Sequence, residues 1–365
     1  MKHTKIKKIL VIRLKQIGDA LLALPVCNSL KATYPDAEIH YLVYQHITPL
    51  LENQPGIDKL QVITPQERKS KRLYAKKIFA LRNEQYDVVL DLINVPISTI
   101  TTFLSGAPLT IGFDKKKARK HLYKRAIKRT SGETRNSSLV KLDILKGLDD
   151  QAVIDTQWQI PVEETARNEV REIMQSYGVN FDQPIVFIAA TSRREDKLWP
   201  QEYLIECINH LQKQYDCQIV FNWVPGVEGD YVAELADKLA SKKGVFANID
   251  LTLKQLPVAI SQCDFFFGND GGPHHMAVGT GVPSLVIYAP FHSKQTWLPA
   301  NKPQHQGIDL KDATGISTDE FYKNRKQIKA EYARHYQTIK PELVLQKLDS
   351  MLKDCLLYTS DAADE

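Results

Sequence analysis

The chain has 365 residues and a mass of 41.5 kDa, a length that predicts two domains of about 150 residues or one larger domain. Hydrophobic residues make up 43% of it and charged residues 25%, which excludes a disordered chain, a collagen-like chain and a disulfide scaffold. The five cysteines include no Cys-x-x-Cys pair, as is typical of reduced thiols in a cytosolic protein. The formal net charge of +5 is too small to indicate a nucleic acid partner.

The first half of the chain predicts alternating strands and helices. Residues 9–12 are apolar and branched, as expected of a parallel strand buried on both faces. A helical pattern follows over residues 20–30, and further strands are predicted at 39–44 and 88–90. This alternation is typical of a doubly wound parallel sheet.

The same alternation begins again in the second half. Helices are predicted over residues 163–177, 203–215 and 231–240, and strands over 185–189, 219–221, 265–267 and 284–288. We therefore expect two similar α/β domains, residues 1–162 and 163–355. Residues 319–355 predict a charged helical stretch, and residues 356–365, which do not continue its pattern, are expected to be a non-native or disordered tail.

Apolar segments are short throughout the sequence. No segment approaches the roughly 20 apolar residues that span a bilayer. The apolar stretch at residues 9–12 is shorter than the ~7 residues of a minimal signal-peptide core. We expect a soluble protein that stays in the cytoplasm.

Polar residues that follow predicted strands are the candidate site residues, because ligands of open α/β sheets bind beyond the carboxyl ends of the strands. Asp19 comes soon after the first strand, at a predicted helix start, either as a helix cap or as a general base. No Gly-x-Gly-x-x-Gly fingerprint and no Gly-x-x-x-x-Gly-Lys-[Ser/Thr] loop occurs in the chain. The missing fingerprint disfavours an NAD-dependent oxidoreductase.

Three further segments of this kind lie in the second half. Thr191, Ser192 and Lys197 form either an anion site or a polar loop that caps a helix. Gly271 and Gly272 allow backbone amides to approach a ligand at a helix start. His274 and His275 are adjacent and diverge on a helix, so zinc is not expected. Glu228 is either a ligand for a ribose or base, or a solvated loop acid.

Taken together, these residues resemble glycosyltransferase family 9, the heptosyltransferases of Gram-negative bacteria. The resemblance runs from about residue 9 to residue 348. It is carried by residues 12–19 with 24–25, by 191–192 with 196–200, and by 268–275. Residues 42–45 and 50–53 are similar to the heptosyltransferase III branch.

The resemblance implies a GT-B fold, in which two Rossmann-like domains face each other across a cleft. It also implies inverting transfer of heptose from ADP-L-glycero-D-manno-heptose to the inner core of lipopolysaccharide, without a metal or other cofactor. By motif, Asp19 matches the general base and Lys197 the lysine on the donor diphosphate. Further donor-binding positions match at Thr191, Ser192, Glu228, Asp270, Gly271, Gly272 and His275. Gly271 departs from the family, which usually has Ser or Thr there.

Basic residues concentrate in the first half. Residues 115–129 hold nine Lys and Arg and no acid, and residues 68–77 hold six. The longer run is either a solvated helix face or a surface for the anionic, lipid-linked acceptor at the inner membrane. The acceptor-binding residues we predict are Lys15, Lys115, Lys116, Lys117, Arg119 and Lys120. The alternatives are transfer from another nucleotide sugar and a non-catalytic protein that binds a nucleotide sugar or lipopolysaccharide.

Overall fold

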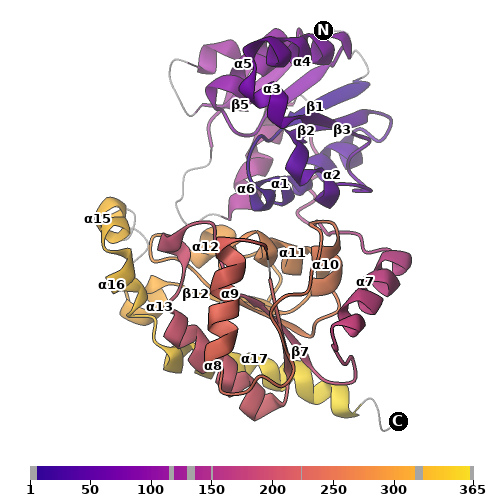
Figure 1. Ribbon diagram of the computed structural model, residues 1–365. Helices are drawn as coiled ribbons and strands as arrows, with labels where there is room; N and C mark the ends of the chain where they lie inside the picture. The colour runs from indigo at the N-terminus through magenta and orange to yellow at the C-terminus, as the bar shows by residue number, and fades with distance from the viewer. Residues whose placement is uncertain are drawn as a thin grey trace. The chain divides into compact units, whose positions relative to one another are not determined.

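The computed structural model describes residues 6–114, 119–129, 136–148, 151–222, 224–316 and 324–361. The chain divides into two units, Met1–Ile160 and Pro161–Glu365, next to the boundary after residue 162 that the sequence predicts. Each unit contains one six-stranded parallel sheet with helices around it (Figure 1).

The sheet of the first unit is built around β1 (Lys8–Ile12), which pairs in parallel with β2 (Glu38–Tyr44) and β4 (Val88–Asp91). Residues 9–12 are fully buried, as their apolar pattern predicts. The sheet is completed by β3 (Lys59–Ile63), β5 (Leu109–Phe113) and β6 (Arg125–Ile127). The helices are α1 (Ile17–Leu21), α2 (Leu24–Thr33), α3 (Pro65–Lys69), α4 (Lys71–Asn83), α5 (Pro96–Leu104) and α6 (Ser137–Leu142), with 3-10 turns η1 (Gln45–Leu50), η2 (Lys120–Leu122) and η3 (Asp143–Gly147).

The sheet of the second unit is built around β7 (Ile185–Ala189), which pairs in parallel with β8 (Gln218–Phe221) and β10 (Phe265–Asn269). The outer strands are β9 (Val245–Phe246), β11 (Ser284–Ile287) and β12 (His305–Ile308). Around them lie α7 (Glu164–Ser176), the 3-10 turn η4 (Glu195–Lys197), α8 (Gln201–Tyr215), α9 (Val227–Lys238), α10 (Gln255–Ile260), α11 (Gly272–Thr280), α12 (Lys294–Trp297), α13 (Leu310–Thr314), α15 (Arg325–Ala330), α16 (Tyr332–Tyr336) and α17 (Pro341–Asp361).

The two sheets share one strand order. It is β3-β2-β1-β4-β5-β6 in the first unit, and the corresponding β9-β8-β7-β10-β11-β12 in the second. This is the doubly wound Rossmann order, which reverses direction between its first and fourth strands and binds ligands beside that point. The prediction of two Rossmann-like α/β domains is confirmed.

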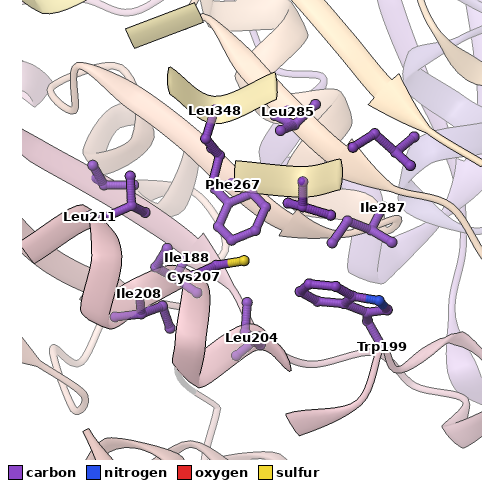
Figure 2. Packing of buried hydrophobic residues seen from close by; sticks show 14 of the residues in the cluster. Ile188, Trp199, Leu204, Cys207, Ile208, Leu211, Phe267, Leu285, Ile287 and Leu348 are labelled. Atoms are coloured by element: carbon purple, nitrogen blue, oxygen red, sulfur yellow. The ribbon is translucent and has the colours of Figure 1, made fainter. Parts of the chain in front are cut away.

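The core of the second unit anchors the loop that follows β7. Trp199, at the end of that loop, is buried among Leu204 of α8, Phe267 of β10 and Ile287 of β11 (Figure 2). Leu348 of α17 packs into the same cluster, so the long C-terminal helix lies on the sheet together with α8. The loop over residues 190–198 therefore begins at the buried strand β7 and ends at the buried Trp199, so the hydrophobic core fixes both of its ends.

Several elements differ from the sequence-based expectation. The sequence does not predict β3, β5, β6 and β12, because they are short and carry polar residues or glycine among the apolar ones, or β9, because it has only two residues. The predicted helix over residues 20–30 is two helices, since α1 ends at Leu21 and α2 starts at Leu24. Pro25 opens α2, where its missing amide proton costs little.

The basic run is not a helix where the structure describes it. Lys115, Lys116 and Lys117 lie outside the described residues. Within 119–129, η2 is followed by β6, which pairs with β5, so the alternative interpretation of the run as a solvated helix face is wrong for these residues. Sheet pairing overrides the local preference of a lysine-rich segment.

The C-terminal helix is longer than its pattern predicts. α17 continues past Cys355 to Asp361, because extending an existing helix costs far less than starting one, and residues 362–365 lie outside the described ranges. Among the described residues, we find no helix with the length and apolar character needed to cross a membrane.

Candidate functional site

Asp19 lies in the first turn of α1, just beyond the carboxyl end of β1. The N-cap of α1 is Gln16, so the interpretation of Asp19 as the helix cap is wrong. Its Oδ1 instead accepts a hydrogen bond from Nη2 of Arg13, and Nη1 of the same guanidinium donates to the carbonyl oxygen of Leu92 at 2.7 Å. Arg13 thereby ties the carboxylate to the segment that follows β4, at the point where the strand order reverses.

Three basic side chains act on the Asp19 carboxylate. Lys15 Nζ lies 4.0 Å from its Oδ2, and the buried Lys141 of α6 acts on it through space. Burial raises the pKa of Asp19, but Arg13, Lys141 and Lys15 outweigh burial and lower it. The carboxylate is therefore ionised at neutral pH. Burial and the neighbouring Arg13 in turn hold the pKa of Lys141 well below its usual range.

The other predicted acceptor residues that the structure describes make contacts elsewhere in the first unit. Arg119 donates through Nε to Oδ1 of Asn94 at 3.1 Å and through Nη2 to the carbonyl oxygen of Asn94 at 3.0 Å. Lys120 Nζ lies 3.8 Å from Oδ2 of Asp114. Both are polar contacts at the carboxyl ends of β4 and β5, where Asn94 and Asp114 follow the strands.

Lys197 and Asp270 come together in the second unit. Lys197 Nζ donates to Oδ2 of Asp270 at 2.8 Å, and Nδ1 of His292 lies 3.1 Å from the same oxygen. Burial raises the pKa of Asp270, but His292 and Lys197 outweigh burial and hold it far below its usual range. A buried carboxylate thus carries two cationic or polar partners, of which the sequence predicted Lys197 and missed His292.

The Asn269 side chain connects the loops that carry Lys197 and Asp270 by two hydrogen bonds. Asn269, at the end of β10, donates through Nδ2 to the carbonyl oxygen of Ala190 at 2.7 Å and accepts from the backbone amide of Trp199 at 3.0 Å. The hydroxyl of Tyr336 donates to the carbonyl oxygen of Lys197 at 3.0 Å. The loop after β7 is therefore fixed at both ends to its neighbours, and Lys197 is positioned by backbone contacts on either side.

Thr191 and Glu228 also come together. The Thr191 hydroxyl donates to Oε2 of Glu228, in the first turn of α9, at 2.9 Å. Ser192 is the next residue of the same loop and is half-buried. This contact joins the loops after β7 and β8, which the adjacency of those strands brings to one edge of the sheet.

The glycines around Asp270 serve different purposes. Gly268 has φ +139°, and a Cβ there would overlap the carbonyl group of Ala189 on β7. Gly271 is the N-cap of α11 in extended backbone, and a Cβ there would meet only Pro273 at 3.6 Å. Gly272 is the first residue of α11. The backbone amides of the first turn, which have no acceptor within the helix, therefore lie close to Asp270 in the chain.

Histidines and aromatic rings pack behind this helix start. His275 is buried on α11 with its ring 6.4 Å from that of Trp297, and the His292 ring is 5.7 Å from the same indole. His274 is fully buried between Phe266 and Tyr288. Across the ranges given above, no group of three or more His, Cys, Asp or Glu side chains is placed to hold a metal ion.

Comparisons with known proteins identify a family. The model of glycosyltransferase family 9 (heptosyltransferase) matches residues 75–320, a range that includes Lys197 and Asp270 and begins after Asp19. Lipopolysaccharide heptosyltransferase 1 of Campylobacter coli is 25% identical over 293 residues, which are 77% of this chain and 83% of the relative. Lipopolysaccharide heptosyltransferase 3 of Escherichia coli is 26% identical over 279 residues, 74% of this chain and 80% of the relative.

A solved structure shows the same fold. The glycosyl transferase family 9 structure from Veillonella parvula has a TM-score of 0.83 at 20% sequence identity. The match covers 95% of this chain and 98% of the other. It extends over both sheets, and the fold class is therefore that of the solved family 9 transferases.

Proposed function

The chain belongs to glycosyltransferase family 9, and from this membership we propose that it transfers heptose from ADP-L-glycero-D-manno-heptose to the inner core of lipopolysaccharide, with inversion at the anomeric carbon. The observation that carries the proposal is the Asp19 carboxylate, which is half-buried beyond the end of β1 and kept ionised by Arg13. A group of this kind suits the one proton transfer that the reaction needs.

Asp19 is the general base of this proposal. An acceptor hydroxyl is a weak nucleophile, and a positioned carboxylate that takes its proton in the transition state contributes typically ~10²–10⁴-fold. Arg13 occupies Oδ1, so Oδ2 is the oxygen that receives the proton. The lowered pKa keeps the base unprotonated, while the same cations make it a weaker proton acceptor.

The second unit is the donor side of the proposal. Negative charge grows on the diphosphate as the glycosidic bond breaks, and a fixed cation with helix-start amides stabilises it. Lys197 and the start of α11 supply these groups, with Thr191, Ser192 and His275 as further donor contacts. Asp270 is proposed to accept hydrogen bonds from the donor sugar, and Glu228 to bind the nucleoside.

The first unit is the acceptor side of the proposal. A phosphorylated, lipid-linked saccharide at the cytoplasmic face of the inner membrane is anionic, which suits Lys15, Arg119 and Lys120 together with Lys115–Lys117. The relatives include heptosyltransferases 1 and 3 at similar identity, so assignment to the heptosyltransferase III branch stays a prediction. The proposed transfer, with Asp19 as the base and Lys197 on the leaving diphosphate, needs no metal ion.

Mass spectrometry of truncated lipopolysaccharide acceptors incubated with ADP-heptose tests the proposal. A heptose-sized mass gain on one acceptor is the expected result. Gain with a different nucleotide sugar only would favour another GT-B transferase, and stabilisation by ADP-heptose without any product would favour a non-catalytic binding protein. A thermal-shift series tests the remaining alternative, an NAD-dependent oxidoreductase. ADP should stabilise the protein and NAD should not.

A further inference from the structure

Helix α5 buries its polar face and exposes its apolar face. Its hydroxyl-bearing residues Ser98, Thr99, Thr101 and Thr102 are buried, with at most 1% of their surface exposed. Its exposed side chains include Ile100, Phe103 and Leu104, at the i, i+3, i+4 spacing of one helix face. A helix of a globular domain normally does the reverse, burying its apolar face and exposing its polar one.

The buried hydroxyls of α5 are satisfied. Ser98 donates to Oδ2 of Asp91 at 2.7 Å, and the Thr99 hydroxyl lies 2.7 Å from that of Tyr123. Thr101 and Thr102 donate to the carbonyl oxygens four residues earlier, at 2.8 and 2.9 Å. The inward face is therefore a bonded polar network, and rotating the helix to bury Phe103 would break it.

The neighbouring helix α4 adds apolar side chains to this face. α4 and α5 lie side by side in the first unit (Figure 1), and the Tyr74 hydroxyl of α4 is 2.9 Å from that of Thr101. Phe79 is 64% exposed on α4 and Phe103 is 57% exposed on α5. Exposed apolar groups of this size on adjacent helices mark an interaction surface rather than scattered surface residues.

Positive charge flanks the apolar side chains on the side of α4. Residues 68–83 contain seven Lys and Arg and no acid, whereas α5 carries no charge at all. Arg72 and Lys76 are exposed on the same stripe of α4 as Phe79, at helical spacing. The guanidinium of Arg82 lies against Gly106, two residues after the end of α5, so a basic residue of α4 reaches the C-terminal end of α5.

We propose that this surface docks the protein onto an anionic phospholipid bilayer. We call it the α4–α5 face, formed by Phe79, Ile100, Phe103 and Leu104 beside the basic rim of Lys69, Lys71, Arg72, Lys76 and Arg82. Aromatic and aliphatic side chains that enter the headgroup boundary, flanked by lysine and arginine, are the pattern of a protein that lies on a membrane. The basic rim is complementary to lipid phosphate, and the exposed apolar side chains are complementary to the acyl chains beneath it.

The inference deepens the membrane contact of the proposed function by assigning it to residues outside the donor and acceptor groups named above. Co-sedimentation of the full chain with vesicles tests it, using phosphatidylglycerol with phosphatidylcholine against phosphatidylcholine alone. The variants are Phe79→Ser/Phe103→Ser and Arg72→Glu/Lys76→Glu. Matched controls are Val153→Ser/Ile154→Ser, exposed apolar residues elsewhere in the first unit, and Lys213→Glu/Lys243→Glu, exposed lysines of the second unit.

We expect the wild-type chain to bind the anionic vesicles and to be released by salt. Each test variant should lower the partition coefficient by roughly tenfold or more, while each control stays within about twofold of wild type. Heptose transfer to a short acceptor without lipid should be the same in all five proteins. Vesicle binding without any transfer would contradict the proposed function and support the α4–α5 face.

Two results would overturn the inference. One is vesicle binding by Phe79→Ser/Phe103→Ser that equals wild type. The other is a wild-type chain that forms a dimer and does not bind vesicles, together with a Phe79→Ser/Phe103→Ser variant that is a monomer. That result would assign the face to a second copy of the chain.

Discussion

Lys197 donates a 2.8 Å hydrogen bond to Asp270, although 73 residues separate the two in the chain. The contact forms because β7 and β10 are adjacent and parallel, so the loops that follow them leave the sheet at the same edge. Without a donor, the Lys197 ammonium is thus already positioned and neutralised. In the proposed function, a donor diphosphate would compete with this buried carboxylate, which holds Lys197 in place at the cost of some donor affinity.

Replacing Lys197 should affect the reaction itself as well as donor binding. We expect Lys197→Ala to lower the rate at saturating ADP-heptose by about 10²-fold, because a preorganised charge on the leaving group is lost. Lys197→Arg should recover part of the rate, and Lys213→Ala, on the outer surface of α8, should match wild type. Steady-state kinetics with varied donor measures both effects, and an unchanged saturating rate would rule out the leaving-group role.

Replacing Asp19 should separate catalysis from donor binding. Asp19→Asn keeps the shape of the side chain and removes the proton acceptor, so transfer should fall by about 10²–10⁴-fold. Stabilisation by ADP in a thermal-shift assay should persist, because the proposed donor residues are in the other unit. Asp182→Asn, an exposed carboxylate, is the control. Near-normal turnover of Asp19→Asn would contradict the assignment of the base.

The two glycines beside Asp270 should respond in opposite ways to a side chain. At Gly271 the extended backbone and the open space accept Ser, whose hydroxyl can cap α11, so Gly271→Ser should raise the free energy of unfolding by a few tenths of a kcal/mol. At Gly268 the positive φ and the adjacent Ala189 backbone leave no room, so Gly268→Ala should lower it by at least ~2 kcal/mol. Urea unfolding measures both, and equal effects would refute the distinction.

Stability in acid should depend on Glu84. Its carboxylate accepts from Lys59 at 2.7 Å, Gln61 at 3.0 Å and Lys8 at 3.3 Å, and the Lys59 bond is the main cause that lowers the pKa of Glu84 to about 2. Because the folded chain releases this proton more readily than the unfolded chain, the stabilisation is complete above about pH 5 and disappears as the pH falls towards 2.

Glu84→Gln should therefore lower the urea midpoint at pH 7 and flatten its decline between pH 5 and pH 3 relative to wild type. Part of the decline should remain, since the pKa values of Asp19 and Asp270 are also lowered. Glu172→Gln, an exposed residue of α7, is the control and should retain the wild-type slope. Parallel curves for Glu84→Gln and wild type would contradict the ion-pair argument.

Local pattern in the sequence predicted the central strands and the three polar segments after them. β1, β7 and β10 are runs of apolar residues because both of their faces are covered, and such runs are recognisable without any tertiary information. The strands at the outer part of each sheet were missed, since a half-covered strand such as β6 tolerates charge and has no clear pattern.

The partners of the site residues came from the tertiary structure alone. Asp19, Lys197 and Asp270 could be selected from the sequence because each follows a strand beside polar neighbours. Lys141 and His292 could not, because each lies on a segment with an unremarkable pattern and reaches the site only when the sheet assembles. Periodicity reports which face of an element is buried, whereas the protonation of a carboxylate depends on charges that the fold brings from distant parts of the chain.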